Sequence, residues 1–217
     1  PGATHRVVNS AFVRRWLRHS VEEEQPKVTE EMNNHLIIIG YGPSGRHLAR
    51  AAKVARIPYT IIEMNPETVE EERSKGESIF YGDASQDYIL EHVKIKQARV
   101  VVIAISDLFA TRQAVQMARH LNPNTHIIAR TRFLREEKPL FELGADEVIP
   151  EELEASVEIF SRVLAKYFVP QDDIEQLIAE IRADKYKRLR TNEVPETTFP
   201  DVRSYLSDMD ITTLRIH

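Results

Sequence analysis

Short apolar runs alternate with amphipathic segments through the middle of the chain. Six runs have the length of strands, at 35–39, 59–63, 78–81, 99–105, 126–130 and 147–149. The segments between them carry apolar residues at helical spacing, at 43–55, 66–75, 86–92, 108–120 and 134–143. This alternation predicts an α/β fold with a doubly wound, parallel, six-stranded sheet. The run from Arg99 to Ile105 is apolar at nearly every position, which predicts a strand buried on both faces.

A glycine-rich turn follows the first strand and opens the first helix, with the sequence Gly40-Tyr41-Gly42-Pro43-Ser44-Gly45. Gly40 permits a tight bend, Gly42 lets the backbone approach a phosphate, and Gly45 lets the helix pack close to the strand. The helix then directs its unpaired N–H groups at an anion. The turn predicts a nucleotide site. An ordinary strand, turn and helix is the alternative.

A carboxylate ends the second strand, about twenty residues beyond the turn. Glu63 stands where an acidic residue accepts hydrogen bonds from ribose hydroxyls in dinucleotide-binding sheets. The same charge would repel a 2′-phosphate, which disfavours an NADP-type ligand. The alternative is an ordinary surface glutamate.

Ligands of open α/β sheets bind beyond the carboxyl ends of the strands. The residues that follow the third, fourth and fifth strands should therefore face the same crevice: Asp83 with Ala84, Ser106 with Asp107, and Arg130 with Thr131. An aspartate can accept from an adenine amino group, and an arginine can neutralise phosphate. A turn-forming aspartate and a solvated arginine are the alternatives.

The pattern changes after Pro150. A helix expected at 151–168 is apolar on most of its surface, so most of that surface must be covered. Its own sheet can cover one side, and a second copy of the chain is the simplest cover for the other. A second helix at 171–188 completes a helix-turn-helix arm, which predicts a homodimer through 151–188. Residues 190–217 read as a polar linker and an isolated strand-like segment.

Charge is distributed unevenly along a chain of 217 residues with a net charge of −5. Residues 1–20 are basic and form an amphipathic stripe with Trp16, which suits a membrane surface or packing on the chain's own domain. An acidic linker follows as far as Asn34. The acidic balance argues against nucleic acid as the main partner. The absence of cysteine removes disulfides and thiolate metal sites, and no apolar run is long enough to span a bilayer.

Catalytic signatures are missing from the sequence. The eight histidines form no constellation, and there is no G-x-S-x-G elbow, H-E-x-x-H pair or phosphate-loop lysine. Acidic residues such as Glu151 and Glu152 fall in the first turn of a helix, where the helix dipole accounts for them. We therefore expect a binding domain with neither a catalytic residue nor a metal site.

Four ordered segments closely resemble the RCK (regulator of K⁺ conductance, TrkA-N) domain: Ile39–Arg46, Ile62–Pro66, Tyr81–Ser85 and Gly144–Pro150. The resemblance covers about 35–188 and is strongest to the cytosolic domain of Kef-type monovalent cation:proton antiporters. It implies a Rossmann-like fold, adenine-nucleotide binding, dimerisation and transmission of the ligand state to a membrane carrier on the cytoplasmic face. The resemblance further implies four regions: a basic juxtamembrane helix and acidic linker at 1–34, a nucleotide-binding lobe at 35–150, a dimerisation arm at 151–189, and a linker with the start of a truncated second lobe at 190–217.

The resemblance also assigns roles at matching positions. It implies phosphate contacts at Gly40, Gly42, Ser44 and Gly45, ribose contacts at Glu63 and Asn65, and adenine contacts at Asp83 and Ala84. Many members carry an arginine directly after the second glycine, whereas this chain has Pro43. Arg46 or Arg130 could stand in for it, but the change favours AMP over ADP, ATP or NAD(H).

The sequence is thus interpreted as the nucleotide-sensing region of a K⁺ or Na⁺/H⁺ antiporter, attached to an N-terminal membrane transport domain. Two alternatives remain at this point. One is a fragment of an NAD-dependent oxidoreductase, and the other is a soluble subunit that docks on a separate channel or transporter.

Overall fold

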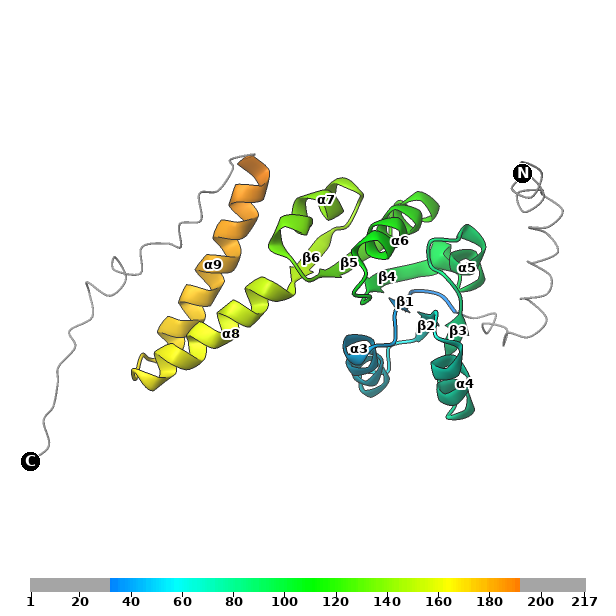
Figure 1. The fold of residues 1–217 in the computed structure, drawn as a ribbon, viewed down its shortest axis with the longest axis horizontal. Coiled ribbons are helices and arrows are strands. Elements are labelled where there is room, and N and C mark those ends of the chain that lie inside the picture. The colour runs from blue at the N-terminus through cyan, green and yellow to red at the C-terminus, as the bar shows by residue number, and fades with distance from the viewer. Residues whose placement is uncertain (1–31, 192–217) are drawn as a thin grey trace, which may run out of the picture. The chain divides into compact units, whose positions relative to one another are not determined.

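A computed structural model describes the backbone of residues 32–191 and the side chains of residues 32–182 (Figure 1). The basic helix expected within residues 1–20 and the strand-like segment near the C-terminus both fall outside this range. The chain divides into two compact units between Glu154 and Ala155. We call them the sheet unit and the helical unit. No helix in the described part of the chain is long and apolar enough to cross a membrane.

The sheet unit contains six parallel strands in the order β3-β2-β1-β4-β5-β6. The strands are β1 (His35–Ile39), β2 (Tyr59–Glu63), β3 (Ile79–Tyr81), β4 (Ala98–Ile103), β5 (His126–Thr131) and β6 (Glu147–Pro150). The predicted doubly wound sheet is confirmed. The strand order reverses between β1 and β4, and ligands of such sheets bind outside the carboxyl ends at that switch point.

Helices lie on both sides of this sheet (Figure 1). They are α3 (Pro43–Val54), α4 (Pro66–Ser74), α5 (Asp87–His92), α6 (Leu108–Leu121) and α7 (Glu137–Glu142), with 3₁₀ turns η1 (Ile95–Gln97) and η2 (Leu134–Glu136). Buried residues of α3 and α4 pack with β1, β2 and β3 on one face. Buried residues of α5, α6 and α7 pack on the opposite face, across the whole sheet.

One face of β4 is less covered than its sequence predicts. Val101 and Ile103 are fully buried, but Val100 and Val102 are only half-buried, so the prediction of burial on both faces is wrong. The expected strand also ends early, at Ile103. The physical reason is that α3 and α4 lie over the other half of this face. Ile128 of β5 belongs to neither buried cluster.

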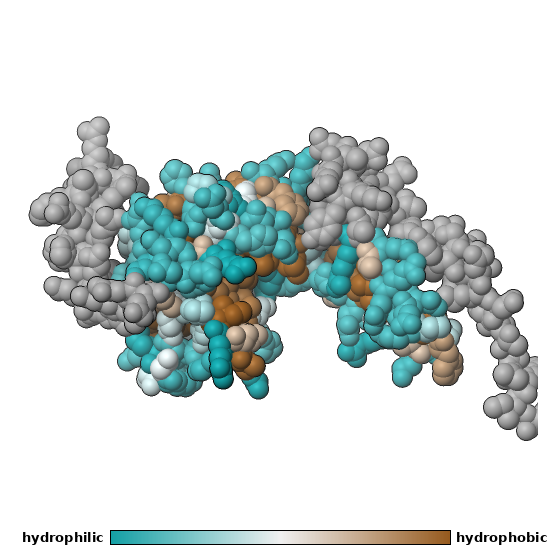
Figure 2. Space-filling model, turned by 180° about the vertical axis from the view of Figure 1, so that it is seen from behind, coloured by the Kyte–Doolittle hydropathy of each residue, from teal (hydrophilic) through white to brown (hydrophobic). Residues whose placement is uncertain are grey.

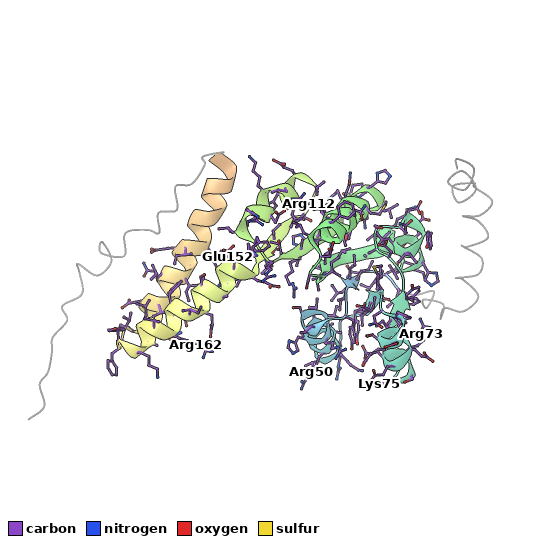
Figure 3. The ribbon with its side chains drawn as sticks, viewed as in Figure 1. Arg50, Arg73, Lys75, Arg112, Glu152 and Arg162 are labelled. Carbon is purple, nitrogen blue, oxygen red and sulfur yellow. The ribbon has the colours of Figure 1, made fainter. Side chains whose placement is uncertain are left out.

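The last two helices form a hairpin. They are α8 (Glu151–Lys166), which crosses from the sheet unit into the helical unit, and α9 (Gln171–Thr191). The polar side of α8 carries an ion pair between Arg162 and Glu158, with 2.6 Å between Nε and Oε1 (Figure 3). The two helices lie where the sequence predicts a helix-turn-helix arm. Figure 2 shows hydrophobic side chains at the end of this hairpin.

The end of α8 has the hydrogen bonds of a Schellman motif. The Phe168 N–H donates to the Ala165 carbonyl and the Val169 N–H donates to the Leu164 carbonyl, both at 3.2 Å. Phe168 has a φ of 61°, a left-handed conformation that usually selects glycine. An aromatic residue at this position, 92% exposed, therefore carries a conformational cost without a packing gain in the single chain.

The segment that starts at Gly144 has a structural role. The Arg119 side chain donates to the Gly144 carbonyl at 3.0 Å and to Asp146 Oδ2 at 2.6 Å. The same Asp146 oxygen accepts from the Ile127 N–H at 2.7 Å. These contacts connect α6 to the amino ends of β5 and β6, opposite the carboxyl ends where the site is predicted.

Protonation of His35 should destabilise the sheet unit. His35 is fully buried on β1, with Nε2 2.9 Å from the Val93 carbonyl and no partner for Nδ1. Burial lowers its pKa below the usual 6.5, and the charge of Lys94 adds to this, while the hydrogen bond to Val93 opposes it. The unfolded chain therefore binds a proton at a pH where the folded chain does not. The free energy of unfolding should fall as pH drops below about 7, by up to about 1.4 kcal/mol per pH unit from this residue.

Urea denaturation between pH 5 and pH 8 measures this effect. We expect His35→Gln, whose side-chain amide can still donate to Val93, to show a shallower loss of stability than the parent protein. His47→Gln removes an exposed imidazole from α3 and is the control. Equal slopes for the parent and His35→Gln would contradict the assignment.

Candidate functional site

A cleft of about 310 Å³ opens at the carboxyl ends of the central strands. Seven predicted residues line it: Gly40, Gly42, Glu63, Asp83, Ala84, Ser106 and Asp107. They come from the end of β2 and from the turns that follow β1, β3 and β4. The cleft thus lies at the switch point of the sheet, and its volume is at the small end of the range for ligand pockets.

The three glycines of the turn have different surroundings. Gly40 has a φ of +96°, and a Cβ there would lie 2.7 Å from Ile105. A Cβ on Gly45 would lie 2.0 Å from the Gly40 carbonyl oxygen, so only glycine lets α3 approach β1. A Cβ on Gly42 would meet nothing within 4 Å. The side of Gly42 that lacks a side chain is therefore open space at the cleft.

No side chain accepts a hydrogen bond from the backbone N–H groups at the start of α3. Gly42 is the N-cap and makes no side-chain hydrogen bond, and the first turn contains no acidic residue. In contrast, Asn65 caps α4 by accepting from the Thr68 N–H, and Asp107 caps α6 by accepting from the Ala110 N–H. The N–H groups at the start of α3, beside the cleft, are thus available to an anion.

Glu63 links the two turns that border the cleft. Its Oε2 accepts from the Tyr41 N–H at 2.7 Å, and its Oε1 accepts from the N–H groups of Met64 at 2.9 Å and Asn65 at 2.8 Å. A carboxylate offers about four acceptor positions, so one remains for a ribose hydroxyl. Glu63 is consequently both a structural residue and a candidate ligand-binding residue.

Other predicted residues do not line the cleft: Tyr41, Pro43, Ser44, Gly45, Asn65, Arg130 and Thr131. The Tyr41 side chain is buried in the core under α3 and α4, and Asn65 acts as a helix cap. Asp83 does line the cleft, but its Oδ1 also accepts from the Ser85 N–H, as a turn-forming aspartate does.

Arg130 reaches the glycine turn from β5. Its guanidinium donates to the hydroxyls of Ser44 at 2.8 Å and Ser106 at 2.7 Å. The structure therefore places Arg130 beside the open helix end, although 86 residues separate it from Ser44.

Apolar walls are the part of the cleft that the sequence motifs did not indicate. Ile39, Ile62 and Ile105 line the cleft together with Met64, which is 59% exposed. The strand expected at 99–105 includes Ile105, but β4 ends before it. Ile39 and Ile62 begin two of the segments that resemble the RCK domain, but the sequence did not assign the isoleucines to a cleft wall, because isoleucine also occurs at other positions in the strands.

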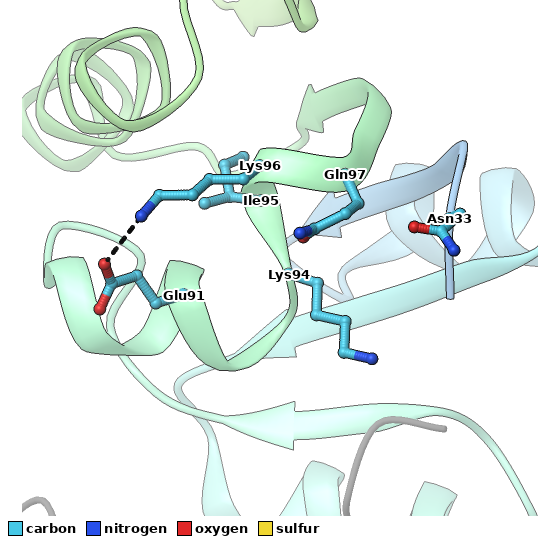
Figure 4. Close-up of a pocket in the computed structure, with 6 residues that line it drawn as sticks. All are labelled: Asn33, Glu91, Lys94, Ile95, Lys96 and Gln97. Carbon is cyan, nitrogen blue, oxygen red and sulfur yellow. Dashed lines mark ion pairs between the residues drawn. The ribbon is translucent and has the colours of Figure 1, made fainter. Parts of the chain in front are cut away.

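A second depression lies at the opposite ends of the strands. It has a volume of about 280 Å³ and is lined by Asn33, which precedes β1, and by residues around η1, which precedes β4 (Figure 4). The Nζ atom of Lys96 there lies 3.5 Å from Oε1 of Glu91. Amino ends of parallel strands rarely bind ligands, so this depression is the weaker candidate. No group of three or more possible ligands for a metal ion occurs in the described part of the chain.

Comparison with known proteins adds to this geometry. The family model of the TrkA-N domain matches residues 36–151. The chain is 32% identical over 181 residues to a protein of Alkalimonas amylolytica named putative K(+) efflux antiporter KefB. The aligned region covers 82% of this chain but only 27% of that relative.

Two solved structures share the fold. The TrkA-N domain of the inner membrane protein ybaL from Escherichia coli is 28% identical with a TM-score of 0.58, and the match covers 60% of this chain and 96% of that one. A Kef CTD from Shewanella denitrificans in AMP bound form is 24% identical with a TM-score of 0.62, covering 72% and 98% respectively.

Alanine substitutions at two of the glycines should differ in their effect on stability. Gly45→Ala should lower the free energy of unfolding by about 1–3 kcal/mol, because its methyl group collides with the Gly40 carbonyl. Gly42→Ala should change stability by less than about 0.5 kcal/mol, because its φ of −67° suits alanine and its methyl group meets open space. Chemical denaturation checks both values.

Proposed function

The chain belongs to the TrkA-N domain family, and from that premise we propose that it is the nucleotide-sensing regulatory region of a K⁺(Na⁺)/H⁺ antiporter. In this proposal an adenine nucleotide binds the cleft, the region works as a homodimer on the cytoplasmic face of the membrane, and a membrane transport domain of the same protein receives the signal. The relative of this chain named as a K⁺ efflux antiporter supports the assignment.

The open end of α3 is the observation that carries the proposal. The backbone N–H groups around Gly42 would hold a phosphate, because no side chain competes for them. Glu63 would accept from the ribose, and the isoleucine walls would cover the base, with Asp83 at its polar edge. We expect binding without catalysis, since the cleft presents no nucleophile with an adjacent base.

AMP is the nucleotide that we propose. A cleft of about 310 Å³ suits a mononucleotide better than a dinucleotide. Pro43 leaves the turn without a side chain that could reach distal phosphates, which disfavours ATP. The Kef CTD that shares this fold was also solved in AMP bound form, which supports the same choice.

Isothermal titration calorimetry tests the nucleotide site. AMP should bind the parent protein, and Gly42→Asp should abolish binding, because it places a negative charge where the phosphate lies. Ala51→Asp adds the same charge on the exposed part of α3 and should retain binding. Glu63→Ala is a poorer test, because Glu63 also holds three backbone N–H groups. A parent protein that gives no binding heat with AMP, ADP, ATP or NAD would overturn the proposal.

A homodimer through the 151–188 helices is the second part of the proposal. Ile159 and Val163, one turn apart on α8, are 64% and 48% exposed, and the aromatic residue at the helix end is exposed in a strained conformation. The half-buried residues on one face of β4 and β5 leave a second apolar surface, to which Ile149 of β6 adds. Two incompletely covered apolar surfaces on one chain suit burial between two copies.

Sedimentation equilibrium tests the dimer. The parent protein should be a dimer, and Ile159→Glu combined with Val163→Glu should shift it to monomer at micromolar concentration, because each charge would be buried at the interface. Glu158→Gln, on the polar side of α8, is the control and should remain dimeric. A monomeric parent protein would contradict the proposed homodimer.

A further inference from the structure

The side chain of Arg130 makes contacts with three separate parts of the sheet unit. Nη1 donates to Ser44 on the first turn of α3, and Nη2 donates to Ser106, which follows β4 and lines the cleft. Nε lies 2.7 Å from Oε1 of Glu151, the first residue of α8. One guanidinium therefore connects the proposed phosphate position to the start of the arm helix.

Arg130 is the basic residue that is placed to bind a phosphate in the cleft. The residues that line the cleft in the described part of the chain include the acids Glu63, Asp83 and Asp107 but no lysine or arginine. Arg46 lies near the turn, but its Nε donates to the Tyr41 carbonyl and its guanidinium covers the Tyr41 ring. Both Nη atoms of Arg130 already donate to hydroxyls beside the cleft, and a guanidinium fork binds phosphate well.

The contact between Arg130 and Glu151 is close but poorly directed. Although Nε and Oε1 are 2.7 Å apart, the buried Nε makes no hydrogen bond. The attraction therefore lacks the directed N–H that makes bidentate arginine pairs strong. Glu151 also lies in a first helical turn, where the helix dipole stabilises a carboxylate without any partner. The contact can therefore break without leaving the charge of Glu151 uncompensated, because the helix dipole still stabilises it.

We propose that phosphate and Glu151 compete for Arg130. A phosphate held at the start of α3 binds the guanidinium and draws it away from Glu151, which releases the first turn of α8. The inference rests on the proposed nucleotide site and specifies how that site communicates with the arm. Because coupling is reciprocal, any change that loosens Glu151 from Arg130 must also favour phosphate binding.

Calorimetry on paired variants tests the competition. Glu151→Gln should tighten AMP binding by about two- to fivefold, because the competitor is removed and a partly exposed ion pair contributes at most about 1 kcal/mol. Glu152→Gln is the matched control: it removes the same charge at the next residue of α8 (Figure 3), whose carboxylate accepts from the Leu134 N–H. It should change the affinity by less than about twofold, which is the expected scale of a general charge effect at an exposed site.

A double-mutant cycle assigns the effect to Arg130. In an Arg130→Gln background, where AMP binding is weaker, Glu151→Gln should have no further effect on affinity. Hydrogen exchange of the Glu152 amide, which donates to the Arg132 carbonyl, and of the second-turn amides of α8 should also accelerate when AMP is added to the parent protein and not when it is added to Glu151→Gln.

Three results would overturn the inference. Equal affinities of Glu151→Gln and Glu152→Gln, or an effect of Glu151→Gln that persists without Arg130, would exclude competition while leaving the nucleotide site intact. Slower exchange at the start of α8 with AMP would show that phosphate strengthens the contact. A parent protein that binds no adenine nucleotide would instead remove the proposed function itself.

Discussion

The close approach of α3 to β1 is the constraint on which the rest of the sheet unit depends. It is possible only because Gly45 lacks a Cβ, which would lie 2.0 Å from the Gly40 carbonyl oxygen. This contact fixes the direction in which the first turn of α3 faces, and so determines where the unpaired N–H groups lie. The same approach lets Ala49 and Ala52 of α3 pack with Ile38 in the core. Core packing and anion binding therefore share one backbone contact.

Polar residues around the cleft are divided between structure and binding. Asn65 and Asp107 satisfy the ends of their own helices, and Glu63 holds three N–H groups of the adjoining turns. These bonds fix the loops before any ligand arrives, which limits the ordering cost of binding. Only the first turn of α3 is left uncapped among the three helices compared. The loops around the cleft are thus held by hydrogen bonds, and the first turn of α3 keeps backbone N–H groups that no side chain caps.

Local patterns in the sequence were sufficient for the sheet and the turn. Apolar runs specify the strands, and the glycine spacing specifies the turn, because each depends on neighbouring residues. Coverage of β4 was not predictable in this way: Val100 and Val101 are chemically identical, and only the placement of α3 and α4 decides which of them is buried. The contact of Arg130 with Ser44 likewise depends on the order of the strands. A strand-end rule brings Arg130 to the correct edge but cannot choose its partners.

The free energy of the contact between Arg130 and Glu151 limits the allosteric coupling that one copy of the chain could supply. Arg130 and Glu151 are partly exposed, with side-chain exposures of 24% and 44%, and exposed ion pairs contribute about 0–1 kcal/mol. Allosteric coupling is typically about 1–3 kcal/mol. One such pair therefore falls at or below the lower limit. Two copies that change together would double the contribution, which gives the proposed dimer an energetic role. Because α8 follows β6 without an intervening residue, release of its first turn would act directly on the helix that carries the dimer surface.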